Sequence, residues 1–139
     1  MKPVQQTKTG PLRGDCLAAC VASIFEVSIK DVPHLDEDSW HQNLREWLNA
    51  RSFSFVYIES DAQSLAAPDG LSIACQSFYV STGEYAGEKR THCVVSHNGT
   101  TIWDPWPGSG TFSQKSPETV SWIVFTVLDP SLCEARCSL

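Results

Sequence analysis

The sequence has little positive charge, no long apolar run and no detectable internal repeat. Ten Lys and Arg residues stand against 16 Asp and Glu residues, so the net charge is −6 and the pI is about 5.0. Nucleic acids and anionic membranes bind basic faces, and we therefore expect neither as a partner. No apolar stretch is long enough to cross a bilayer, and Met1 is followed by polar residues instead of an apolar leader. We expect a cytoplasmic protein.

The composition is that of one folded domain. A chain of 139 residues with 42% hydrophobic and 19% charged residues can bury a core of its own. No segment has the composition of a linker, so we expect a single domain over residues 1–139. The six cysteines are expected to be mostly reduced thiols, because disulfide frameworks belong to oxidising compartments.

Hydrophobic periodicity predicts helices first and strands afterwards. Asp15 is a good N-cap for a helix that begins at Cys16, and a second helix is expected over 39–50, after a turn at 28–33. Apolar and β-branched runs predict strands at 53–58, 71–78, 91–97, 100–104 and 120–128. The polar stretch 81–90, with two glycines, is expected to be a loop. This order predicts an α+β domain whose first helix packs on a mostly antiparallel sheet.

Cys16 is the candidate nucleophile. A thiol on the first residue of a helix lies at the positive end of the helix dipole and beside backbone N–H groups without helical partners. Both favour the thiolate, which is the reactive form of cysteine. Cys20 lies one turn later within the apolar stripe, so a packing role explains it better.

A cysteine nucleophile needs a base, and His92 is the best candidate among four histidines. His34 lies in an acidic turn, His41 lies on a polar helix start, and His97 lies at a hairpin tip. His92 opens the apolar strand that continues through 93–95, where the imidazole can be held in one orientation. An imidazole near its ordinary pKa can take a proton from a thiol at neutral pH.

Asp104 is the candidate third group, which would orient the histidine. It ends the strand that follows Asn98-Gly99, a strong hairpin signal. A strict two-residue loop there would place Asp104 opposite residue 93, on the other sheet face from His92. A shift of one residue places Asp104 opposite residue 94 and diagonal to His92 on one face. The catalytic interpretation therefore predicts an offset hairpin or an equivalent local bend.

These residues resemble a known family. The runs 14–24, 92–95 and 103–105 are similar to the papain-like cysteine peptidases, in particular the small bacterial and phage branch that includes the bacteriocin-processing peptidases. The resemblance implies a papain-like fold with a central helix on an antiparallel sheet. It also implies a triad of Cys16, His92 and Asp104, with no cofactor.

The same resemblance places a glutamine amide in the oxyanion hole, upstream of the cysteine. Gln6 is the candidate, with Gln5 beside it. Gly14 would let a substrate backbone approach closely, and Trp103 and Trp106 would either line a substrate groove or simply pack.

The expected activity is cleavage of a peptide, isopeptide or other amide bond in a peptide or protein substrate, through an acyl-enzyme. Two alternatives stay open at this point. The same triad serves transglutaminases and acyltransferases, and a non-catalytic module on this fold could bind and inhibit a host protein, with some of the five tryptophans as anchors.

A zinc site is the chemical rival. The pairs Cys16/Cys20 and Cys133/Cys137, with His92-Cys93, could supply ligands. Structural zinc pairs more often use Cys-x-x-Cys in a loop, so we expect no metal.

Overall fold

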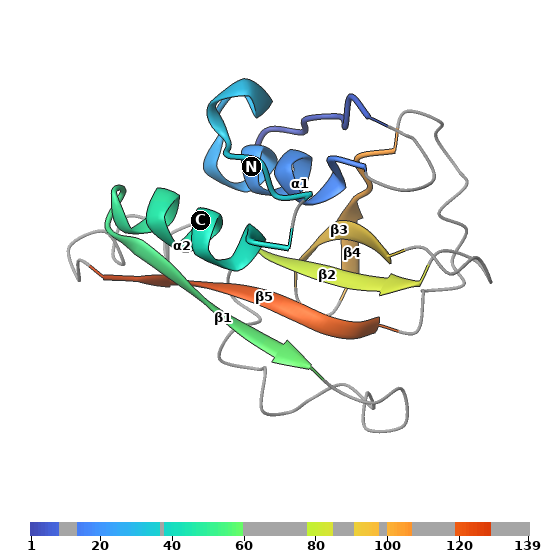
Figure 1. Ribbon diagram of the computed structural model, residues 1–139. Coiled ribbons are helices and arrows are strands. Elements are labelled where there is room, and N and C mark those ends of the chain that lie inside the picture. The colour runs from blue at the N-terminus through green and yellow to red at the C-terminus, as the bar shows by residue number, and fades with distance from the viewer. Residues whose placement is uncertain are drawn as a thin grey trace.

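The computed structural model describes residues 1–8, 14–36, 38–59, 78–84, 91–97, 100–106 and 119–128. The elements in chain order are α1 (Cys16–Phe25), the 3-10 turn η1 (Ile29–Asp31), α2 (Trp40–Asn49), β1 (Phe53–Glu59), β2 (Tyr79–Glu84), β3 (Thr91–His97), β4 (Thr100–Trp103) and β5 (Thr119–Val127). The strands form one sheet in the order β1-β5-β2-β3-β4, and every neighbouring pair is antiparallel. Both helices lie over the same face of this sheet (Figure 1). The expected α+β class, with an N-terminal helix on an antiparallel sheet, is confirmed.

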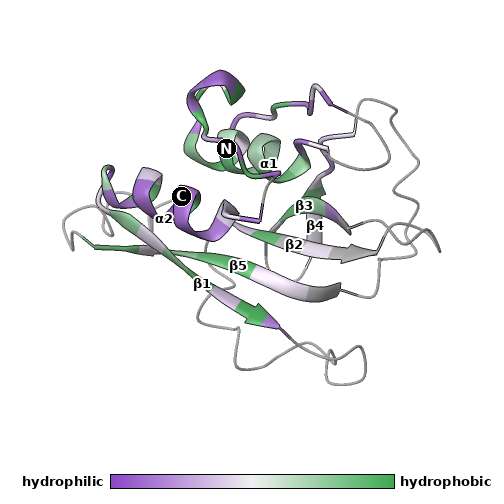
Figure 2. Ribbon diagram, in the orientation of Figure 1, coloured by the Kyte–Doolittle hydropathy of each residue, from purple (hydrophilic) through white to green (hydrophobic). Residues whose placement is uncertain are grey.

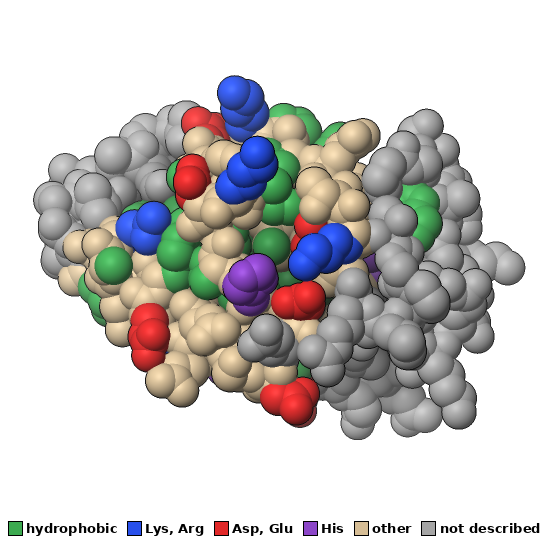
Figure 3. All heavy atoms as spheres, turned by 45° about the horizontal axis from the view of Figure 1, so that its top comes forward, with side chains coloured by type: hydrophobic (Ala, Val, Ile, Leu, Met, Phe, Trp, Pro, Cys, Tyr) green, Lys and Arg blue, Asp and Glu red, His purple; other side chains and the backbone are tan. Residues whose placement is uncertain are grey.

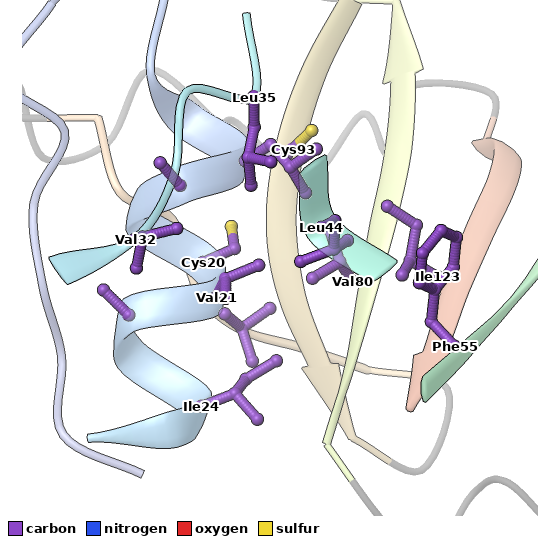
Figure 4. Packing of buried hydrophobic residues seen from close by; sticks show 14 of the residues in the cluster. Cys20, Val21, Ile24, Val32, Leu35, Leu44, Phe55, Val80, Cys93 and Ile123 are labelled. Carbon is purple, nitrogen blue, oxygen red and sulfur yellow. The ribbon is translucent and has the colours of Figure 1, made fainter. Parts of the chain in front are cut away.

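Helix α1 is the central element of the core. Every residue from Cys16 to Ile24 is buried, and Figure 2 shows this helix as apolar around its visible circumference. Its predicted stripe faces the sheet: Cys20, Val21 and Ile24 point toward β2 and β3 in Figure 4. The opposite side is covered because the N-terminal arm, residues 1–8, bonds to Ser23.

Helix α2 is amphipathic, as its sequence predicts. Leu44 and Leu48 are fully buried, Trp47 is half-buried, and most of the other α2 residues are exposed. Because α2 packs on β1 with one stripe, it covers the end of the sheet that α1 leaves open (Figure 1). None of the helices in the described ranges is long and apolar enough to cross a membrane.

An aromatic cluster joins these layers at the C-terminal end of α1. The Phe25 ring meets Trp47, Phe53 and Phe125 edge-on, with ring centroids 5.7, 5.1 and 5.1 Å away. Edge-to-face contacts at these distances are favourable beyond the area that they bury. They fix α1 against α2, β1 and β5, and with it the position of Cys16.

The middle strand of the sheet, β2, begins one residue after the end of the strand expected at 71–78. The expected strand at 71–78 falls almost entirely outside the described residues, and Phe78 is not in a strand. The structure instead has β2 at Tyr79–Glu84, so the expected loop at 81–90 is wrong for 81–84. Polar residues can form this strand because both its edges are paired, with β3 and β5, which satisfies its backbone groups. Residues 85–90 of that loop lie outside the described residues.

Candidate active site

Cys16 is the first residue of α1, as the sequence predicts. Asp15 occupies the N-cap position, but its carboxylate makes no hydrogen bond to the helix. It accepts instead from the backbone N–H of Thr7 at 2.9 Å and of Lys8 at 2.8 Å. The expectation of Asp15 as a helix cap is therefore wrong for its side chain, because the arm supplies competing donors. The Asp15 side chain therefore leaves the N–H groups at the start of α1 uncapped.

His92 and Asp104 are in direct contact. His92 Nε2 lies 2.8 Å from Asp104 Oδ1, and the imidazole is buried. Asp104 Oδ1 also accepts from the backbone N–H of Trp106 at 2.9 Å. This second bond fixes the carboxylate on the histidine. The Trp106 ring stands edge-on to the imidazole, with centroids 6.3 Å apart.

A bulge in β4 makes this contact possible. At the hairpin tip His97 pairs with Thr100 and Ser96 with Thr101, which is the register of a two-residue loop. Val95 then pairs with Trp103, so Ile102 is an extra residue on β4. The register after the bulge puts Asp104 on the His92 side of the sheet. The predicted local bend is confirmed, and it lies at Ile102 instead of at the turn.

The electrostatics of Cys16 favour the thiolate. Hydrogen bonding from the Cys93 side chain is the largest influence that lowers the pKa of Cys16, and burial opposes it. A hydrogen bond to His92, the charge of His92 and the Cys93 backbone lower this pKa further. The pKa of Cys16 consequently lies well below its ordinary value of 9.0.

The electrostatics of His92 favour the imidazolium. Burial is the largest influence and lowers the pKa of His92, whereas hydrogen bonds to Asp104 and Cys16, and the charges of both, raise it. The raising influences prevail, and the pKa of His92 is about 9 against an ordinary 6.5. Because one pKa falls and the other rises, a thiolate–imidazolium pair is the favoured state near neutral pH.

Gln6 lies beside the start of α1. Its side chain is 5% exposed, and a Cβ placed on Gly14 would be 3.4 Å from Gln6 Nε2. One N–H of this amide donates to Lys8 O at 2.9 Å, while Oε1 is buried and has no hydrogen-bond partner among the described residues. The amide therefore keeps one N–H that the arm does not use. Gln5, the alternative, is exposed.

Trp103 is bound to the N-terminal arm. Its indole Nε1 donates to Val4 O at 3.0 Å, and its ring packs against the core. The backbone N–H of Gln6 donates to Pro105 O at 2.9 Å. Of the two roles considered for Trp103, packing is the one that its contacts support. The arm also connects α1, through Ser23, to the segment that carries Asp104.

The other three histidines lie apart from this group. His41 stacks on Trp40 at a centroid distance of 3.6 Å on the exposed side of α2. His97 packs beside Phe78, and His34 lies at the surface after η1. Among contacts between described residues, His92 is the one histidine of the four that meets both a carboxylate and a cysteine.

A pocket of about 560 Å³ opens beside the start of α1. Gly14, Asp15 and Leu17 line one wall, η1 and the residues up to Asp36 line the other, and Cys16 is not part of the lining. The face of the molecule in Figure 3 shows apolar side chains bordered by both acidic and basic ones. Lys8 and Asp36, both in the lining, lie 4.0 Å apart.

The zinc hypothesis has no support within the described ranges. They contain no group of three or more His, Cys, Asp and Glu side chains arranged to hold a metal ion. Cys16, Cys20 and Cys93 are free thiols, and Cys133 and Cys137 lie outside the described residues.

Cys93 is the site residue that the sequence reasoning missed. The sequence places it in an apolar strand and among the possible zinc ligands, yet its side chain is the largest influence that lowers the pKa of Cys16. Strand alternation contains the signal, because Cys93 and Val95 are two residues apart and share a face of β3, and Val95 packs in the core cluster with α1.

No protein-family model matches this chain, and no curated protein matches it.

Proposed function

We propose that the protein is a papain-like cysteine hydrolase that cleaves a peptide, isopeptide or other amide bond through Cys16, His92 and Asp104. The observation that carries the proposal is the 2.8 Å contact between His92 and Asp104, on a histidine that also interacts with Cys16. Three side chains that are distant in the sequence meet in the order nucleophile, base and orienting acid.

The thiolate of Cys16 attacks the carbonyl carbon, and the C=O π electrons move to the oxygen. Backbone N–H groups at the start of α1 hold this oxyanion, since Asp15 does not occupy them. The free N–H of Gln6 is the candidate additional donor. Gly14, with no side chain beside the amide of Gln6, keeps this approach open.

His92 then acts as general acid. Its imidazolium gives a proton to the leaving nitrogen as the C–N bond breaks, which leaves a thioester on Cys16. Asp104 holds the ring through Nε2, which leaves the other ring nitrogen, Nδ1, for the interaction with Cys16 and for proton transfer. His92 next takes a proton from water, which attacks the thioester and releases the acid. An amine in place of water would give acyl transfer with the same residues.

The decisive experiment is intact-mass detection of a covalent adduct with a panel of acyl and peptide electrophiles. We expect the wild type to form one adduct on Cys16, Cys16→Ala to form none, and His92→Ala to form it much more slowly. Cys20→Ala is the matched control, because it removes a buried thiol one helical turn away and should leave the adduct intact. A Cys16→Ala protein that keeps its activity would end the proposal.

A further inference from the structure

Three buried thiols lie together at the candidate site, and the mechanism uses only one. Cys16, Cys20 and Cys93 belong to the same packed cluster. Cys16 is 9% exposed, whereas Cys93 is 4% exposed and Cys20 is fully buried. A reagent from solvent therefore meets Cys16 first.

Cys93 faces Cys16 across the interface between β3 and α1. In Figure 4 its side chain lies in the layer between α1 and the sheet, beside Leu35. The register agrees, because Val95 and its partner Val80, on the same face of the sheet, both pack in the cluster with α1. Both side chains belong to one packed cluster, and Cys93 is the largest influence that lowers the pKa of Cys16, so side-chain rotation is the main movement needed to bring the two sulfurs together.

Cys20 is less suited to bond with Cys16. Residues four apart on a helix have Cβ atoms roughly 5–6 Å apart, and a disulfide requires about 3.5–4.5 Å. The helix backbone fixes that separation, whereas Cys93 approaches from another element. The two neighbours of Cys16 thus form a natural pair for comparison.

We propose that Cys93 is the resolving thiol of Cys16, so that oxidation of the nucleophile by a peroxide ends in a reversible Cys16–Cys93 disulfide that switches the site off. The proposal rests on the proposed function in taking Cys16 as the reactive nucleophile. It adds a modification site and a form of regulation to that function.

The chemistry balances in three steps. The Cys16 thiolate attacks the O–O bond of the peroxide, which gives a sulfenic acid and releases hydroxide or an alkoxide. The Cys93 sulfur then attacks the Cys16 sulfur, the S–O bond breaks, and the hydroxyl leaves as water with the thiol proton. Two equivalents of a thiol reductant restore both thiols and become a disulfide themselves.

The test is peroxide treatment followed by alkylation and tryptic mapping without reduction. Cleavage after Arg13, Lys30, Arg90 and Lys115 puts Cys16 and Cys20 in peptide 14–30 and Cys93 in peptide 91–115. We expect these two peptides to become cross-linked, with the loss of two hydrogen atoms. Alkylation of Cys16 should disappear with the cross-link and return fully after dithiothreitol.

Variants identify the partner. Cys20→Ala leaves one cysteine in peptide 14–30 and should form the same cross-link. Cys93→Ala should form none, and its Cys16 should proceed to the sulfinic acid, which dithiothreitol does not reverse. The wild-type map alone is decisive if Cys93→Ala fails to fold. A wild type whose Cys16 is oxidised to the sulfinic acid without any cross-link, or one in which Cys16 pairs with Cys20, would overturn the proposal.

The outcomes separate this inference from the proposed function. If Cys16 forms an adduct with acyl electrophiles but no cross-link after peroxide, the disulfide proposal is wrong and the hydrolase proposal stands. If the Cys16–Cys93 cross-link forms in a protein that gives no acyl adduct, the hydrolase proposal is wrong and the disulfide proposal stands.

Discussion

His92 Nε2 lies 2.8 Å from Asp104 Oδ1, although the turn between their strands has the register that would place them on opposite sheet faces. Because Ile102 is an extra residue in β4, Trp103 and Asp104 point to the sheet faces opposite to those that a regular strand would give them. A single bulge therefore brings the acid to the histidine, in keeping with the frequent use of bulges to re-aim side chains near functional sites.

Alkylation of Cys16 should depend on pH in the manner of an ion pair. The pKa of Cys16 is well below 9.0 and that of His92 is about 9, so the thiolate–imidazolium pair exists between these values. The rate at which iodoacetamide alkylates Cys16 should rise with pH, and the midpoint of this rise should lie well below the pKa of an ordinary thiol. Hydrolysis, which also needs the His92 proton, should fall again with a midpoint near 9. An alkylation limb at the ordinary thiol pKa would contradict the pairing.

Asp104→Asn should weaken the imidazolium. The carboxylate raises the pKa of His92, so its removal moves that pKa down from about 9 and shifts the falling limb of the hydrolysis profile to lower pH. Turnover should drop roughly 10²- to 10⁴-fold. Circular dichroism checks that the fold survives. An unchanged falling limb would mean that Asp104 does not act on the base.

Asp15→Ser separates two roles of one side chain. Serine is as good an N-cap as aspartate, so a capping role predicts little change. The structure instead has the carboxylate bonded to the backbone N–H groups of Thr7 and Lys8, which serine is too short to serve together. We expect a loss of about 1–2 kcal/mol in the free energy of unfolding, measured in urea, since hydrogen bonds to charged groups are worth this much when partly exposed. Stability equal to the wild type would favour the cap.

Gly14→Ala should disturb the start of α1. The new Cβ would lie 3.1 Å from Lys8 O, a backbone atom that cannot move alone, and 3.4 Å from Gln6 Nε2. Overpacking of this kind costs roughly 1–3 kcal/mol. The free energy of unfolding should fall, and the rate of Cys16 acylation should fall with it if Gln6 is displaced. If the variant is destabilised but its Cys16 is acylated at the wild-type rate, Gln6 has no role in the oxyanion hole.

Trp103→Phe tests packing against substrate binding. Phenylalanine keeps the ring in the core but leaves Val4 O without its donor, which should cost about 1 kcal/mol in stability. The KM of any substrate found should stay within twofold of the wild type. A large rise in KM with unchanged stability would assign Trp103 to the substrate groove instead.

The local sequence pattern predicted most of the helices and strands, and it placed Cys16 at the start of a helix. Helix α1 begins at Cys16 and α2 buries Leu44 and Leu48 as their spacing predicts, because a helix forms from contacts within a few residues. Strands β1, β3 and β5 also lie within a residue or two of their predicted bounds. Strand β2 does not, because its polar residues are ordered by pairing with β3 and β5, which no local window records.

The sequence by itself determined which residues carry reactive groups and that Cys16 starts a helix. Only the tertiary structure decided which partners these groups meet. The bulge at Ile102, the carboxylate of Asp15 on the arm and the thiol of Cys93 against Cys16 all depend on contacts between segments far apart in the chain. Register and interfaces are set by the packing of whole elements, because a shift of one residue costs nothing locally and reverses every side chain on a strand.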